Sequence, residues 1–202
     1  MSVATLPAPT TSRVVTEERV VDAALRCIAR WGVAKTTLDD VAREAGISRA
    51  TVYRLFPGGK EGLMDAVATT EAARFFAAVS ARMAEADSLE DTLVGGMAEA
   101  GRRMCSHPAL QFLMAHEPEA VLPRLAFAKL DEVLAAAARV AAPHLERWLD
   151  HDTALRAGEW AARLVLSYAC TPGESHVDIA EEASVRNLVR AFVLPGLVHE
   201  HR

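Results

Sequence analysis

Three residues at fixed spacing, Ala42, Gly46 and Val52, place the strongest constraint on how this chain can fold. Two short helices can cross at close range only if a small residue lies at the crossing point, a role that suits Ala42. The turn between them needs a residue that accepts positive φ, and Gly46 meets that need. Val52 supplies the aliphatic side chain that fills the gap from the second helix. Together these residues predict a helix-turn-helix unit.

Apolar residues recur at helical spacing along the chain, and no stretch alternates with a period of two. This pattern predicts an all-α protein of about nine helices. The first helix is expected from about Thr16 to Trp31, where Gly32 ends it. Either Thr36 or Thr37 can cap the second helix, and Ser48 can cap the third.

Basic residues are concentrated near the predicted turn. The segment GISRATVYRLFPGGK, residues 46–60, contains three cations and no acid, although the whole chain has a formal net charge of −5. Residues 13–60 hold nine Lys or Arg against six Asp or Glu, whereas the rest of the chain holds 13 against 21. This asymmetry indicates that one end of the chain contacts a polyanion.

The start of the third helix is expected to face solvent, because Val52 turns inward. A helix of about seven residues is about 10 Å long and fits end-on into a DNA major groove about 12 Å wide. Arginine can donate two hydrogen bonds to guanine, small apolar groups can meet a thymine methyl, and a tyrosine hydroxyl can reach a phosphate. The predicted DNA contacts are Thr36, Thr37, Ser48, Arg49, Ala50, Thr51, Tyr53, Arg54 and Lys60.

The segment TTLDDVAREAGISRATVYRLFPGGKEGLMDAV resembles the DNA-binding domain of the TetR family of bacterial transcription regulators. The resemblance covers about residues 16–67. It rests on Thr37, Ala45-Gly46, Tyr53, Phe56, Lys60 and Leu63. Compared with the family pattern, Pro57-Gly58-Gly59 lengthens the turn before Lys60 by about one residue, which leaves the contact of Lys60 with phosphate open.

The resemblance implies a homodimer that binds a double-stranded DNA operator, most often as a repressor, and a helical domain that binds a small molecule. We therefore expect a disordered tail over residues 1–12, a helix-turn-helix DNA-binding domain over 13–62, and a ligand-binding and dimerisation domain over 63–202.

Methionine and phenylalanine residues gather in the first half of the expected ligand-binding domain. Methionine suits a cavity that accepts varied apolar guests, and Gly95-Gly96 and Gly101 indicate the close approach of a neighbour. Ordinary core packing explains many of these residues equally well. Together with the resemblance, this composition predicts a hydrophobic effector, such as a fatty acyl chain, a sterol or a drug-like molecule. The predicted pocket residues are Phe76, Met97, Met104, Phe112, Met114, His116, Phe127, Arg163 and Tyr168.

Two stripes of small and aliphatic residues near the end of the chain predict a dimer interface. Small residues let helices approach closely, so two helix pairs can form a four-helix bundle across a two-fold axis, as the resemblance also implies. An intramolecular core is the alternative. The stripes consist of Leu155, Gly158, Ala162, Val165 and Ala169 on one helix and of Val185, Leu188, Val189 and Phe192 on the next.

Nothing in the sequence indicates catalysis, a metal site or a cofactor. Cys27, Cys105 and Cys170 lie far apart, and the histidines match no ligand motif. Without a signal peptide or a long apolar run, the chain is expected in the cytoplasm, away from membranes. Two rival functions remain open, a helix-turn-helix adaptor for protein contacts and an activator, each with a bundle core closed to ligands. An all-α enzyme finds no support.

Overall fold

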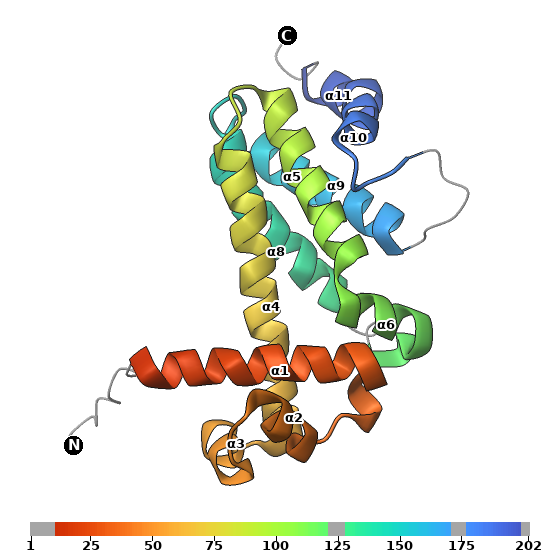
Figure 1. Ribbon diagram of the computed structural model, residues 1–202. Coiled ribbons are helices and arrows are strands. Elements are labelled where there is room, and N and C mark those ends of the chain that lie inside the picture. Colours follow the sequence, from red (N-terminus) through yellow and green to blue (C-terminus); the bar gives the residue numbers. More distant parts are fainter. Residues whose placement is uncertain (1–10, 121–127, 171–176, 199–202) are drawn as a thin grey trace, which may run out of the picture. The chain divides into compact units, whose positions relative to one another are not determined.

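The computed structural model describes residues 11–120, 128–170 and 177–198, and every regular element in these ranges is helical (Figure 1). The predicted all-α class is therefore confirmed. The chain divides into two compact units between Thr70 and Glu71. This division falls inside α4, Gly59–Ala84, so no turn in the sequence marks it.

The first unit contains α1 (Thr11–Lys35), α2 (Leu38–Ala45), α3 (Arg49–Leu55) and the beginning of α4. Its α1 begins earlier than expected, within the stretch assigned to the tail. Gly32, with φ 81°, interrupts the helix as predicted, although a further turn follows it. The interior of the unit is aliphatic and includes Val20, Val21, Val41, Val52 and Leu63.

Polar contacts fix α1 against α2. Arg19 donates to the carbonyl oxygen of Ala45 over 2.7 Å, and Arg26 donates to Glu44 over 2.6 Å. The hydrogen bond from Arg26 lowers the pKa of Glu44. These contacts hold the end of α2 in place, next to the turn that leads into α3.

The predicted helix-turn-helix is present, and each turn residue has a clear mechanical role. Gly46 adopts the left-handed conformation, with φ 65°, and its N–H closes α2 by donating to the carbonyls of Ala42 and Arg43. Ser48 then starts α3 by accepting a hydrogen bond from the N–H of Thr51. Val52 is 0% exposed, which fixes the inward face of α3.

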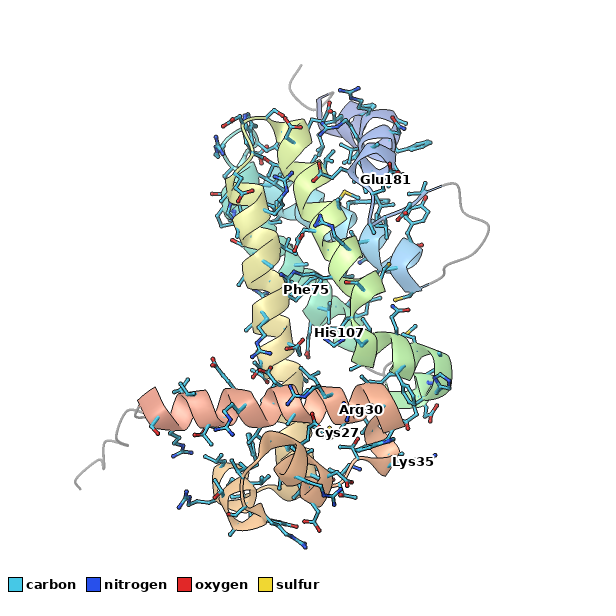
Figure 2. All side chains as sticks on the ribbon, viewed as in Figure 1. Cys27, Arg30, Lys35, Phe75, His107 and Glu181 are labelled. Carbon is cyan, nitrogen blue, oxygen red and sulfur yellow. The ribbon has the colours of Figure 1, made fainter. Side chains whose placement is uncertain are left out.

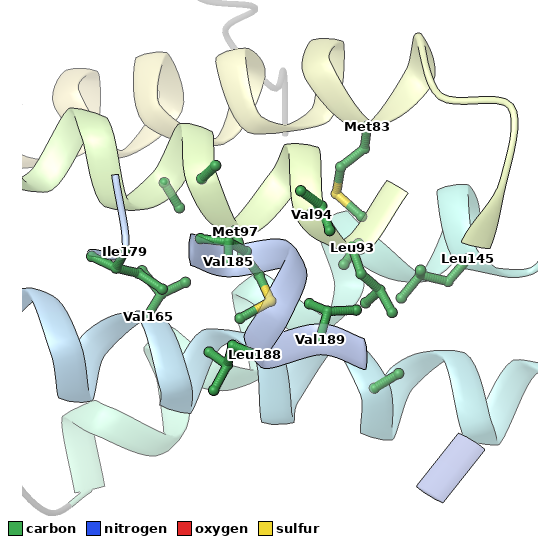
Figure 3. Close-up of a cluster of buried hydrophobic side chains, with 14 of the residues drawn as sticks. Met83, Leu93, Val94, Met97, Leu145, Val165, Ile179, Val185, Leu188 and Val189 are labelled. Carbon is green, nitrogen blue, oxygen red and sulfur yellow. The ribbon is translucent and has the colours of Figure 1, made fainter. Parts of the chain in front are cut away.

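The second unit contains the rest of α4 followed by a bundle of helices (Figure 1). Its core joins apolar side chains from α4, α5, α8, α9 and the C-terminal helices, and Figure 3 shows this cluster. The further elements are α5 (Leu89–Ser106), α6 (Pro108–His116), α8 (Ala128–Leu145), α9 (His151–Cys170), α10 (Glu182–Leu188), the π-helical turn η1 (Val189–Val193) and α11 (Leu194–Val198).

Glycines let several helices of this unit pack closely. A methyl group on Gly158 of α9 would lie 3.0 Å from the side chain of Ala141 of α8. One on Gly101 of α5 would lie only 2.2 Å from the carbonyl oxygen of Ile179. The small residue at Gly158 therefore serves packing within one chain.

Most residues of the two predicted interface stripes take part in this packing. Val165, Val185, Leu188 and Val189 are all buried within the core of a single chain. Leu155 and Ala169 are partly buried against the same core, and Gly158 and Ala162 line an apolar cavity. Of the predicted set, Phe192 alone is strongly exposed, at 78%. Periodicity thus identified a packed face, and its contacts within the chain are those of the core.

Candidate DNA-binding surface and effector cavity

The outward face of α3 carries most of the predicted DNA contacts. Burial of Val52 turns the opposite side of this short helix to solvent, where Ser48, Arg49, Ala50, Tyr53 and Arg54 are exposed and Thr51 is half-buried. The hydroxyl groups of Ser48 and Thr51 lie 2.9 Å apart and are hydrogen-bonded to each other. The structure thus brings together two cations, a phenol and small side chains on one helix.

Arg49 is held in a defined position on this face. Its Nη1 donates to Asp39 Oδ2 over 3.0 Å, and its Nη2 donates to the Tyr53 hydroxyl over 3.3 Å. The guanidinium carbon also lies 5.3 Å from the centre of the Tyr53 ring, a cation–π arrangement. The hydrogen bond to Tyr53 and the charge of Asp39 raise the pKa of Arg49, so the side chain stays cationic.

Three other predicted contacts have partners within the protein. Thr36 is only 1% exposed, and its hydroxyl donates to the carbonyl of Gly32 over 2.6 Å, so it lies in the interior of the unit. Thr37 forms a capping box with Asp40 at the start of α2, and its hydroxyl lowers the pKa of that carboxyl group. Lys60 Nζ donates to the carbonyl of Ala34 over 3.1 Å.

Asp39 is a functional candidate that the sequence reasoning missed. The segment 46–60 contains no acid, but Asp39 reaches Arg49 from the neighbouring helix. A spacing of ten residues across a turn matches no helical period, so only the folded geometry shows the pair. Its presence means that the surface of α3 is not purely basic.

The second unit contains an apolar cavity of about 100 Å³. Its walls come from α4, α5, α8 and α9, and every lining side chain is apolar. Phe75, labelled in Figure 2, extends from α4 and lines this cavity beside Phe76, with the two rings edge to face. Such a space suits an uncharged, hydrocarbon-like guest.

Three of the predicted pocket residues, Phe76, Met97 and Met104, line the cavity. Five do not. On α6, His116 is exposed and stacks on Phe112, and Met114 lies on the same short helix away from the lining. On α9, Arg163 pairs with Glu159 over 2.7 Å at the surface, and Tyr168 packs against the core. Phe127 lies outside the described residues.

Sequence reasoning also missed much of the lining. Ala137 and Ala141 of α8 and Ala161 and Ala162 of α9 border the cavity, together with Gly96 of α5. Small residues leave space rather than fill it, and alanine is also an ordinary helix former. For that reason the sequence offers no signal that separates these alanines from others on the same helices.

Metal and membrane signals are absent from the parts of the chain that the structure describes. Within them, no group of three or more His, Cys, Asp or Glu residues is arranged to hold a metal ion. Nor does any described helix combine the length and the apolar character that crossing a membrane requires.

The geometry defines a helix-turn-helix DNA-binding domain followed by a helical domain with an apolar cavity. Residues 20–67 match the model of the family described as "Bacterial regulatory proteins, tetR family". This segment is therefore similar to the DNA-binding domain of that family, and the similarity of the whole chain to regulators of this kind makes it a DNA-binding transcriptional regulator. Members of this family bind DNA, dimerise and bind small-molecule effectors.

Known relatives extend the similarity over most of the chain. A helix-turn-helix-type regulator of Mycobacterium tuberculosis is 27% identical over 180 residues, which cover 88% of this chain and 83% of the relative. The regulator AlkX of the same organism is 28% identical over 192 residues, covering 93% and 89%.

Two solved structures share the fold. The TetR-family repressor AlkX of a Dietzia strain, implicated in the biodegradation of n-alkanes, has a TM-score of 0.65 and 24% identity, covering 90% of this chain and 97% of that one. FadR of Bacillus subtilis, solved with stearoyl-CoA, has a TM-score of 0.63 and 17% identity, covering 87% and 98%.

Proposed function

We propose that the protein is a repressor that binds a pseudo-palindromic operator as a homodimer and is released by a small apolar effector. The observation that carries the DNA part is the exposed face of α3, where Arg49 and Arg54 flank Tyr53. Two copies of α3 would enter successive major grooves, about one helical turn apart.

Selection of bound fragments from genomic DNA, followed by titration against salt, tests this proposal. Binding through several phosphates must weaken steeply as salt rises, by about 0.9 logarithmic units of affinity per phosphate for each tenfold rise. A protein-contact adaptor would select no fragment and would have no DNA affinity to lose.

The surface that we propose for dimerisation lies around Trp160 and Phe192, on α9 and η1. These side chains are 64% and 78% exposed, and both belong to helices whose other faces are packed. Large exposed aromatic residues are typical anchors of interfaces. Trp160→Glu combined with Phe192→Glu should give monomers in analytical ultracentrifugation, and a dimer that persists in this variant would place the interface elsewhere.

The proposed effector is a neutral molecule with a compact apolar body. The cavity lining offers no charged side chain to bind a head group, and a buried charge without a partner is strongly unfavourable. AlkX of Dietzia is implicated in the biodegradation of n-alkanes, and FadR was solved with stearoyl-CoA, so hydrocarbon chains occur with both proteins. At about 100 Å³ the cavity holds only part of such a chain, so a longer guest must displace the flexible side chains of Met83, Met97 and Met104.

Release would follow from a shift of population between two conformations. The helix α4 carries Lys60 near its start, and further along it Phe75 and Phe76 line the cavity. A guest that moves these two side chains can therefore also move the part of α4 that belongs to the first unit. A ligand shifts this equilibrium only by its difference in affinity for the two forms, and a tenfold release needs about 1.4 kcal/mol.

A further inference from the structure

Asp39 and Asp40 are adjacent acids at the start of α2 with different roles. The carboxylate of Asp40 accepts the backbone N–H of Thr37, over 3.2 Å, and so completes the capping box. The carboxylate of Asp39 points to α3 instead, where its Oδ1 lies 2.9 Å from Arg49 Nε and its Oδ2 lies 3.0 Å from Arg49 Nη1. Both carboxylate oxygens therefore contact a single guanidinium group.

This ion pair contributes little to the folding stability of the protein. The side chains of Arg49 and Asp39 are 61% and 49% exposed, and pairs with this much solvent contact contribute little to folding. An acid beside a helix that approaches phosphates also opposes DNA binding by repulsion. A carboxylate in this place needs an explanation other than folding or general affinity for DNA.

We propose that Asp39 positions Arg49 to read a guanine and thereby increases the sequence specificity of the protein. This inference rests on the proposed DNA-binding function. A guanidinium group has five N–H donors; one N–H of Nη1 donates to Asp39 and one N–H of Nη2 donates to Tyr53, while Nε lies 2.9 Å from Asp39 Oδ1 in the ion pair. One N–H remains on each terminal nitrogen. These two form the fork that matches guanine O6 and N7 in the major groove.

The same arrangement limits what Arg49 can contact. A free arginine on an exposed helix can reach any nearby phosphate, which adds affinity for every sequence and specificity for none. Asp39 and the ring of Tyr53 hold the guanidinium against α3, on two sides. Since the Tyr53 hydroxyl accepts from Arg49, its own proton is free to be donated to a phosphate. Asp39 is thus a positioning residue, and Arg49 makes the contact.

The test is a double-mutant cycle of Asp39→Asn and Arg49→Ala in the full-length protein. Its readout is the ratio of the dissociation constants for the selected operator and for an unrelated duplex of equal length. In the Arg49 background, Asp39→Asn should reduce this discrimination at least about fivefold per half-site, the lower end of what one bidentate guanine contact supplies. The loss should map to one G·C pair. In the Arg49→Ala background, Asp39→Asn should leave discrimination unchanged.

Salt dependence supplies a second readout that a merely structural role would not change. A released Arg49 should gain a phosphate contact on the unrelated duplex, which steepens the slope of log affinity against log salt by about 0.9 per protomer. The matched control is Glu85→Gln, which removes one exposed carboxylate from a pair with Arg82 in the second unit and makes the same change in net charge. It should alter neither ratio nor slope.

Several results would overturn the inference. An equal loss of discrimination in both backgrounds would show that Asp39 itself reads a base, such as cytosine N4. If Asp39→Asn bound all sequences more tightly and kept the same discrimination ratio, Asp39 would act only by competing with phosphate for Arg49. If Asp39→Asn changed neither the discrimination ratio nor the salt slope, the Asp39–Arg49 pair would have no role in recognition. If the unmodified protein selects no operator at all, the proposed function itself fails, and this outcome is distinguishable from the others.

Discussion

A larger side chain in the cavity should stabilise the protein and remove its response to apolar guests. A cavity destabilises a protein by about 24 cal/mol per Å³. For a cavity of about 100 Å³ this amounts to about 2.4 kcal/mol. Ala137→Leu adds three carbon atoms to the lining, worth a similar amount at about 0.8 kcal/mol per buried methylene group.

Imperfect fit will reduce this gain, because extra atoms in a packed core usually cost about 1–3 kcal/mol. We therefore expect a net stabilisation of about 1 kcal/mol, which raises the melting temperature of a chain of this size by about 2–4 °C. The matched control is Ala136→Leu on the same helix, one residue away and outside the lining. That variant adds the same atoms without filling the cavity.

The assay is thermal unfolding with and without benzene, a guest that occupies a dry cavity of about 150 Å³ in another protein. Benzene should raise the melting temperature of the unmodified protein and of Ala136→Leu, because it binds the folded state alone. The melting temperature of Ala137→Leu should not rise with benzene. This variant should still bind the operator, but the effector should no longer release it. If Ala137→Leu has a lower melting temperature than the unmodified protein and benzene still raises it by the full amount, the cavity is not the binding site.

Three further predictions concern local geometry. Gly101→Ala should destabilise the protein, because the added carbon meets the carbonyl oxygen of Ile179 at 2.2 Å, whereas Gly95→Ala meets only a flexible side chain at 3.4 Å and should stabilise by up to about 1 kcal/mol in urea unfolding. Tyr53→Phe removes both a donor to phosphate and the acceptor of Arg49 Nη2, so it should weaken binding to all DNA sequences in a fluorescence titration and also reduce discrimination at the base pair that Arg49 reads; unchanged binding to an unrelated duplex would contradict the assignment of Tyr53 to phosphate. Burial, with a smaller effect of the Arg147 charge, lowers the pKa of His144 below its usual value of about 6.5, so the unfolded chain binds this proton more readily. Stability from this group is then complete above about pH 6.5 and decreases as the pH falls through the lowered pKa, and His144→Gln should make the urea midpoint less sensitive to pH between 7.5 and 5.5.

The sequence predicted the local architecture well, because helical periodicity and caps depend on neighbouring residues. Gly46 illustrates this: a short turn between crossing helices permits few residue types, so the steric requirement can be recognised without the fold. Gly101 is a second case, since the expected close neighbour is present at Ile179. The start of α1 was predicted less well, because the helix begins at Thr11 and not near Thr16.

What the sequence could not supply is the identity of the partner across each packed face. The stripe that includes Val185 and Val189 has the spacing of an interface, yet a helix that packs on α5 of its own chain needs the same spacing. The cavity poses a similar problem, because empty space between helices leaves no pattern in the residues around it. The Asp39–Arg49 pair depends on the angle between α2 and α3, which no spacing rule gives.

The same pair explains why overall charge is a poor guide to this protein's function. Interactions between exposed charges decay over about 8 Å at physiological ionic strength, so most of the chain's acids have little influence on a phosphate at α3. Asp39, by contrast, lies in direct contact with Arg49, and its charge acts where the DNA would bind. If overall repulsion limited DNA binding, Glu85→Gln and Asp39→Asn would raise affinity alike. If local geometry controls it, only Asp39→Asn will change which sequences are bound.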